Sequence, residues 1–254
     1  MKSFSNKYIY IYSIVLVVVV AAVLALVAVG LKPHQQKNIK AENMQMLLCS
    51  AGINVDRDKA EDNYNKYITE EYTVNKDGQI IDEYRDGKQI KGERPFNLNI
   101  KAAYKAVKEG KNDAKLPVFV CTKYNGEKIY IIPVRGAGLW GDIWGNIALK
   151  DDLAKVEGVV FDHESETPGL GAKIKDDKSF AKSFVGKTIY EEGNFTSVKV
   201  IKRVDKDNPH AVDALSGATL TSNGVSDMIN DCLKFYLPFF QTLKNNFGYE
   251  HNRK

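Results

Sequence analysis

The chain has 254 residues, which is enough for one large domain or for a domain with substantial additions. Its 36 basic and 32 acidic residues leave a formal net charge of +4, and no basic cluster is interleaved with aromatic residues. Proteins that bind nucleic acids present a strongly positive surface to the phosphates, so composition gives no argument for that class. The function must therefore be inferred from local motifs.

The first element in chain order is an apolar stretch from Tyr8 to Leu31, which contains no Asp, Glu, Lys or Arg. A helix of this length, at about 1.5 Å per residue, is long enough for the roughly 30 Å hydrocarbon core of a bilayer. A cleaved signal peptide is the alternative, but the run is longer than the usual apolar region, and no convincing small-x-small cleavage site precedes Lys32. We therefore expect a retained transmembrane helix at residues 8–31, after a short cytoplasmic tail at residues 1–7.

The charges that flank this stretch do not fix its orientation. Lys2 and Lys7 precede it, and Lys32, Lys37 and Lys40 follow it, so the positive-inside rule gives nearly a tie. A long domain can be translocated regardless of such small differences, and the sequence therefore permits a large outer domain.

Three cysteines do not identify the compartment either. Cys49, Cys121 and Cys232 are widely spaced and form no C-x-x-C motif, which favours structural or free thiols. His163 and Glu164 would point to opposite faces of a strand, and no second histidine stands nearby, so we predict no metal site.

The region after the apolar stretch is predicted to be a stalk helix and an accessory region, residues 32–115. Gln35 to Ala51 has helical apolar spacing, and Gly52 is expected to end that helix. The other predicted elements are strands at Tyr72–Val74 and Ile80–Ile81 around a turn at 75–78, and a short helix that begins near Ala102 and ends at Gly110.

The pattern becomes rich in β-formers from Leu116 onward. Runs at Val118–Tyr124 and Lys128–Val134 flank Asn125 and Gly126, which predicts a hairpin. We expect Pro133 at an edge or at a strand end, because proline cannot donate to a ladder. The remaining predictions are strands at Ala154–His163 and Thr196–Arg203, and a helix at Ser222–Leu237 that Pro238 breaks. The expected fold class is α+β, with a largely antiparallel domain at 116–247 and a polar tail at 248–254.

Three glycine-rich segments stand out within this domain: residues 135–141, 166–171 and 213–221. The first two are not interpreted as nucleotide loops, because no βαβ context and no Gly-Lys-Ser/Thr accompany them. Glycine lets the backbone approach a planar ligand, which Leu139, Trp140, Trp144 and Leu170 could cover. Taken singly, each loop is more readily interpreted as an ordinary turn with buried aromatic residues.

The third segment places the Thr219 hydroxyl among very small neighbours, just ahead of a predicted helix. A threonine hydroxyl is a poor nucleophile near neutral pH, so its modification needs an outside enzyme that approaches closely. Gly217 and Ala218 leave room, and the N–H groups of the helix start could bind a phosphate. The alternatives are an ordinary turn with Ser222 as the helix N-cap and an Asx-turn at Asp213.

The third segment also resembles the flavinylation motif of the FMN-binding domain family. The matching positions are Asp213, Ser216, Gly217, Ala218 and Thr219. The resemblance implies FMN bound covalently, through its phosphate, to Thr219. It also implies maturation by a separate flavin transferase that uses FAD and Mg²⁺ and recognises Asp213.

All three segments in this order, with the amino-terminal helix, are similar to the NqrC family of the sodium-translocating NADH:quinone oxidoreductases. The flavin-carrying counterpart in the related ion-translocating ferredoxin:NAD oxidoreductase complex is the close alternative, and a membrane-anchored sensor or interaction domain without flavin stays open. The likeness covers nearly the whole chain and is loosest between Val55 and Lys115.

This resemblance implies a complex of six subunits in the bacterial inner membrane that oxidises NADH, reduces ubiquinone and exports Na⁺. The large domain would be periplasmic, and this chain in isolation would not turn over NADH. The resemblance implies no catalytic residue in this chain. It places the flavin against Trp140, Glu166, Thr167, Gly169, Leu170, Gly171, Leu215, Ser216, Gly217, Ala218 and Thr221.

Overall fold

The computed structural model describes residues 5–205 and 207–251, which fall into two units, 1–43 and 44–254. Helix α1 runs from Asn6 to Ser50, and its part up to Asn43 belongs to the first unit. Its apolar side chains between Tyr8 and Leu31 are exposed, and the helix passes through Pro33 without ending. Within the described residues, α1 is the helix long and apolar enough to cross a membrane, so it is a candidate membrane span.

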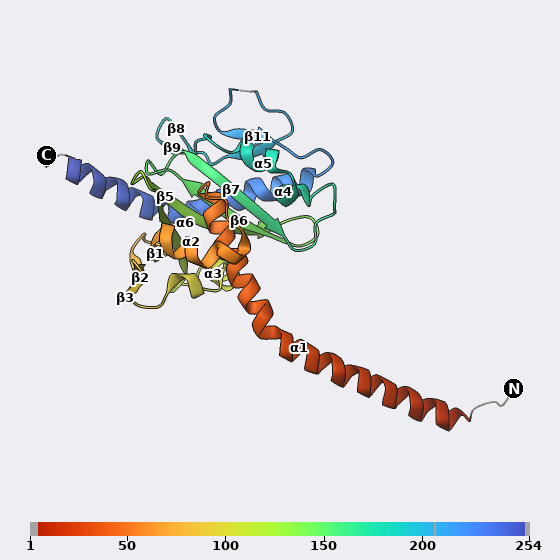
Figure 1. The fold of residues 1–254 in the computed structure, drawn as a ribbon. Coiled ribbons are helices and arrows are strands. Elements are labelled where there is room, and N and C mark those ends of the chain that lie inside the picture. The colour runs from red at the N-terminus through yellow and green to blue at the C-terminus, as the bar shows by residue number, and fades with distance from the viewer. Residues whose placement is uncertain (1–4, 206, 252–254) are drawn as a thin grey trace. The chain divides into compact units, whose positions relative to one another are not determined.

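The second unit is built on a seven-stranded sheet with the order β3-β2-β1-β4-β5-β6-β7, in which every neighbouring pair is antiparallel (Figure 1). This confirms the expected α+β class. The strands are β1 (Ile68–Asn75), β2 (Ile80–Arg85), β3 (Lys88–Lys91), β4 (Lys115–Thr122), β5 (Lys128–Ala137), β6 (Asp142–Leu149) and β7 (Val156–His163).

Two small sheets and several helices complete this unit. Strands β8 (Tyr190–Glu191) and β9 (Asn194–Phe195) pair antiparallel, whereas β10 (Lys199–Ile201) and β11 (Ala211–Asp213) pair parallel. The helical segments are η1 (Arg57–Lys59), α2 (Ala60–Tyr67), η2 (Pro95–Asn97), α3 (Ile100–Lys108), α4 (Lys173–Asp176), α5 (Lys178–Ser183) and α6 (Thr219–His251).

Both faces of the central strands are covered. Along β4, Val118 and Val120 belong to one hydrophobic core, while Phe119 and Cys121 belong to the other. Successive side chains of a strand point to opposite faces, so the two cores lie on opposite sides of the sheet. Helix α6 packs on the first core, and the segment from Met44 to Ala51 packs on the second.

The sheet does not divide at the boundary expected between residues 115 and 116. Strand β1 pairs with β4 from Ile68 opposite Cys121 to Asn75 opposite Lys115. The strands of the expected accessory region are therefore an extension of the same sheet. Their polar sequence did not reveal this, because β3 is exposed along its whole length and β2 is buried at one position.

The position expected for Pro133 was wrong, because this residue lies inside β5, buried and opposite Asn146 of β6. The pairing of β4 with β5 ends at Phe119 opposite Ile131. Proline has no N–H to donate, and no hydrogen bond to β4 is required at Pro133. The Tyr104 hydroxyl donates to the Pro133 carbonyl at 2.6 Å, which satisfies a buried acceptor.

Helix α6 differs from the expectation at both ends. It begins at Thr219, three residues before Ser222, and it continues through Pro238 to His251. Phe239 and Phe240 are buried in the core just beyond the proline, and this packing offsets the hydrogen bond that proline removes. The helix enters the expected polar tail, whose residues 252–254 lie outside the described residues.

Candidate functional site

Thr219 is the first residue of α6 and is exposed. A short turn joins it to β11, and Gly217 in this turn has a φ of +76°, a conformation that favours glycine. A side chain at Gly217 would also come within 2.9 Å of Leu170 Cδ2. The hydroxyl thus stands in an open position that a modifying enzyme can reach.

Ser222 is not the helix N-cap of the alternative interpretation as an ordinary turn. It lies in the first turn, and its N–H donates to the Ala218 carbonyl at 2.9 Å. Its hydroxyl accepts from the Leu215 N–H at 3.1 Å, which closes the turn before the helix. The N–H groups of Thr219 and of the two residues after it precede this first helical bond, at the positive end of the helix dipole.

Glu166 joins the three glycine-rich segments. Its side chain is buried, and its Oε1 accepts from the Trp140 N–H at 2.9 Å. Its Oε2 accepts from the Thr221 hydroxyl at 2.6 Å. The neighbouring Ser165 hydroxyl donates to the Trp140 carbonyl at 2.8 Å, which adds a second link between two of the segments.

The glycines around Glu166 have a role that differs from the one expected. A Cβ at Gly138 would overlap Glu166 Oε1, and a Cβ at Gly171 would overlap Glu166 Oε2. A Cβ at Gly141 would lie 2.7 Å from the Ser165 hydroxyl. These glycines therefore make room for polar side chains of the protein itself, whereas the sequence suggested room for a ligand.

The turn from Thr167 to Ala172 presents Leu170 to solvent. The Thr167 carbonyl accepts from the N–H groups of Leu170 and Ala172, both at 3.1 Å, and Gly169 has a φ of +75°. Leu139, Trp140 and Leu220 are also exposed, at 46, 64 and 60%. Exposed apolar side chains on these turns and at the start of α6 offer a surface that suits a planar, apolar ring.

The structure brings the predicted site residues together in two layers. Trp140, Thr167, Gly169, Leu170, Ser216, Gly217 and Thr219 are exposed, whereas Glu166, Gly171, Leu215, Ala218 and Thr221 are buried. Leu215 and Ala218 belong to the core, so their side chains are not available to a ligand. Sequence reasoning missed Leu220, for which an apolar residue in the polar first turn of a helix was the signal.

Asp213 ends β11 and is exposed. Its Oδ1 accepts from the Val204 N–H at 3.0 Å, so this hydrogen bond reaches back to the preceding loop and does not form an Asx-turn. The carboxylate thus fixes the strand end that leads to the Thr219 turn.

An ion-pair cluster fixes the other end of the site. Lys101 Nζ lies 2.9 Å from the Asp142 carboxylate, and Arg135 also pairs with it. These hydrogen bonds, first from Lys101 and then from Arg135, hold the pKa of Asp142 below its ordinary value. Arg135 lies on β5 and Asp142 on β6, so this ion pair links the two strands where the turn that carries Trp140 begins and ends.

This turn contains Gly136, Gly138 and Gly141, which match the G-x-G-x-x-G spacing of dinucleotide-binding folds. It joins two antiparallel strands, however, and the Gly138 N–H donates to the Gly141 carbonyl at 2.8 Å. No helix starts there, so the spacing is not a pyrophosphate site.

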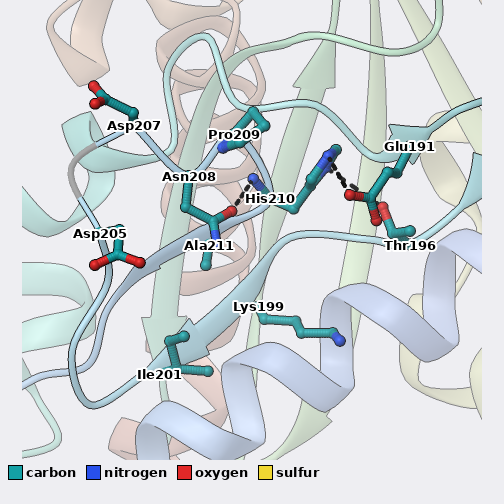
Figure 2. A pocket seen from close by; sticks show the side chains of 10 residues that line it. All are labelled: Glu191, Thr196, Lys199, Ile201, Asp205, Asp207, Asn208, Pro209, His210 and Ala211. Atoms are coloured by element: carbon teal, nitrogen blue, oxygen red, sulfur yellow. Dashed lines mark hydrogen bonds and ion pairs between the residues drawn. The ribbon is translucent and has the colours of Figure 1, made fainter.

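A pocket of about 560 Å³ lies elsewhere in this unit, as Figure 2 shows. In it, His210 Nε2 stands 3.9 Å from the Glu191 carboxylate, and the His210 N–H donates to Asn208 Oδ1 at 2.8 Å. Thr219 does not line this pocket. The candidate site is therefore an open surface beside α6 rather than this pocket.

Residues 138–234 match the FMN-binding domain family, a range that contains Glu166, Thr219 and most of the first glycine-rich segment. NqrC of the Na(+)-translocating NADH-quinone reductase of Vibrio vulnificus is 31% identical over 216 residues, which are 80% of this chain and 81% of that protein. NqrC of Vibrio parahaemolyticus is 30% identical over 212 residues, again 80% and 81%. The chain belongs to the NqrC family of the Na(+)-translocating NADH-quinone reductases.

Solved structures agree with this assignment. NqrC from Parabacteroides distasonis superposes with a TM-score of 0.70 at 35% identity, covering 83% of this chain and 96% of that one. NqrC of Shewanella oneidensis gives 0.66 at 25% identity, covering 81% and 98%. The expected likeness to the NqrC family, and its FMN-binding domain, are thereby confirmed.

Proposed function

We propose that this chain is a membrane-anchored electron-transfer subunit that holds FMN covalently through the Thr219 hydroxyl. It works in a complex that oxidises NADH, reduces ubiquinone and exports Na⁺. The observation that carries the proposal is the exposed Thr219 at the first position of α6, inside the FMN-binding match and two residues after Gly217, which lies against exposed Leu170.

The residues present fit a phosphate-linked flavin. The first turn of α6 offers N–H donors to a phosphoester at Thr219, and the dipole favours its charge. Leu139, Trp140 and Leu170 offer apolar surface for an aromatic ring, and the Thr167 to Gly171 turn and the Ser216 hydroxyl offer polar groups. When bound, FMN supplies one- and two-electron transfer chemistry.

Attachment requires a phosphoryl transfer to Thr219. Its Oγ forms a bond to the phosphorus of the FMN half of FAD, the pyrophosphate bond breaks, and AMP leaves while the hydroxyl proton passes to a base. A separate flavin transferase with Mg²⁺ supplies the base and the charge neutralisation, since among the described residues no basic side chain hydrogen-bonds to this hydroxyl. Asp213, which is exposed near the turn, is the proposed recognition residue for this enzyme.

The anchor and the tether have complementary roles. We infer that residues 8–31 span the bacterial inner membrane and that the large domain lies in the periplasm. There, a covalent link prevents loss of the cofactor into an open compartment. The five companion subunits then supply the NADH and quinone sites, and this chain in isolation does not oxidise NADH.

Co-expression with a flavin transferase tests the proposal. The full chain should give a flavin-fluorescent band after denaturing electrophoresis, and Thr219→Val should abolish it. Thr242→Val, which removes an exposed threonine hydroxyl on the same helix but outside the motif, is the matched control and should keep the band. Fluorescence that persists in Thr219→Val would refute the attachment site, and its absence from the parent chain would favour a non-flavinylated sensor or interaction domain.

A further inference from the structure

We propose that Glu166 is a positioning residue for the carried flavin. Its carboxylate fixes the start of α6, where Thr219 lies, relative to the turn that carries Trp140. This inference rests on the proposed attachment of FMN to Thr219, and it assigns Glu166 a role other than direct contact with the ligand.

Both oxygens of the carboxylate are already engaged by the protein. One accepts from the Trp140 N–H and the other from the Thr221 hydroxyl, which is itself buried. Glu166 is 4% exposed, so its charge is largely withdrawn from solvent. A buried carboxylate is tolerated when donors surround it, and hydrogen bonds to a charged acceptor are stronger than neutral ones. Few other arrangements of these segments would satisfy it.

A tether at one atom leaves a flavin free to rotate about the bonds of its phosphate and ribityl chain. A defined position and orientation of the flavin ring therefore needs apolar surface at a fixed distance from the attachment point. Trp140 and Thr219 are far apart in the sequence. Glu166 accepts a hydrogen bond from Trp140 itself and another from Thr221, which lies two residues after Thr219. The bond to Thr221 acts within one turn of the attachment point.

The surroundings are shaped for this carboxylate. Gly138 and Gly171 each stand where a Cβ would overlap one of its two oxygens. The Glu166 N–H also donates to His163 Nδ1 at 3.2 Å, which holds the backbone of the residue. Two glycines and two hydrogen bonds thus converge on the carboxylate, and a third hydrogen bond holds the backbone of the same residue.

The full chain, co-expressed with a flavin transferase, should be compared as the parent, Glu166→Ala, Thr221→Val and the double variant. Thr221→Ser keeps the hydroxyl, and Glu164→Gln changes an exposed neighbouring carboxylate, so both serve as controls. Covalent loading is read from fluorescence after denaturation. Seating is read in the native protein from visible circular dichroism, flavin fluorescence and the midpoint potential.

We expect all variants to be loaded like the parent. Glu166→Ala and Thr221→Val should lose visible circular dichroism, and their native flavin fluorescence should rise towards that of the denatured protein. The double variant should match Glu166→Ala alone, because Glu166 acts on α6 through Thr221. Thr221→Ser and Glu164→Gln should keep the parent signals.

Parent-like dichroism and fluorescence in Glu166→Ala would overturn the inference, as would additive effects in the double variant. Loss of loading in a folded Glu166→Ala would also overturn it, by placing the residue in recognition by the transferase. Should Glu166→Ala fail to fold by far-ultraviolet dichroism, Thr221→Val carries the test, since it keeps the carboxylate and its bond to Trp140. A parent chain without covalent flavin would instead refute the proposed function.

Discussion

The Thr221 hydroxyl donates to the Glu166 carboxylate across 2.6 Å and joins the start of α6 to the loop that follows β7. Both side chains are buried, although the surface above them is open. The site therefore has an exposed layer suited to a ligand and a buried layer that fixes its geometry. Mutations in the two layers should have different consequences.

Gly171→Ala should destabilise the parent chain, because the added methyl would overlap the Glu166 carboxylate and stand 2.7 Å from the Thr221 hydroxyl. Overpacking of this kind costs about 1–3 kcal/mol. In a Glu166→Ala background the same change should cost less, since the carboxylate is gone. Urea unfolding of the parent, Gly171→Ala, Glu166→Ala and the double variant measures this coupling. An equal loss of unfolding free energy in both backgrounds would contradict the packing described around Glu166.

The extension of the sheet should depend on Arg94. This guanidinium lies 2.7 Å from Glu71, whose side chain is 2% exposed and also accepts from the Tyr64 hydroxyl at 3.0 Å. Arg94→Leu should destabilise the protein by about 3–5 kcal/mol, because breaking a buried pair leaves an uncompensated charge. Lys111→Ala, at an exposed ion pair with Glu109, is the matched control and should change stability little. Similar unfolding midpoints for the two variants would show that the Arg94–Glu71 pair does not stabilise the protein to this extent.

The ion-pair cluster at Asp142 predicts a pH dependence. The folded pKa of this carboxyl is lowered from its ordinary value of 3.8 by Lys101 and Arg135, so its stabilising effect is present above 3.8 and is lost as the pH falls through the folded pKa. Asp142→Asn should therefore be less stable than the parent at pH 7, and the difference should shrink below pH 3.8. Urea titrations at several pH values measure it, and a difference that does not change with pH would exclude this contribution.

The native thiols should react slowly. Burial raises the pKa of Cys121 to about 11 and raises the pKa of Cys49 and Cys232 as well, so little thiolate exists near neutral pH. All three cysteines are free, so denaturation should expose three reactive thiols to a colorimetric disulfide reagent. A fast reaction of Cys121 in the folded protein would contradict its burial.

Much of the sheet could be predicted from the sequence. The runs at 118–124 and 128–134 became β4 and β5, and Asn125 with Gly126 lies in the turn between them, because apolar β-formers and turn chemistry act locally. The same reasoning failed for Pro133 and Pro238. The end of strand pairing near Pro133 and the packing of residues beyond Pro238 depend on tertiary structure. A local sequence pattern does not contain this information.

The prediction of the site rests on a different kind of reasoning. The motif around Thr219 is recognisable because attachment demands particular residues in a fixed order. The role of Glu166 was not recognisable, since its partners Trp140 and Thr221 are distant in the sequence. Its neighbouring glycines were visible, but they were interpreted as room for a ligand, whereas the Glu166 carboxylate occupies the space beside Gly138 and Gly171.

The attachment of FMN to Thr219 is tested most directly by peptide mapping of the full chain co-expressed with a flavin transferase. Trypsin should release residues 207–234 as one peptide that contains Thr219, together with the hydroxyls of Ser216, Thr221, Ser222 and Ser226. This peptide should gain the mass of FMN less one water, and fragmentation should assign the addition to Thr219. An unmodified peptide, or an addition at any other hydroxyl, would contradict the account.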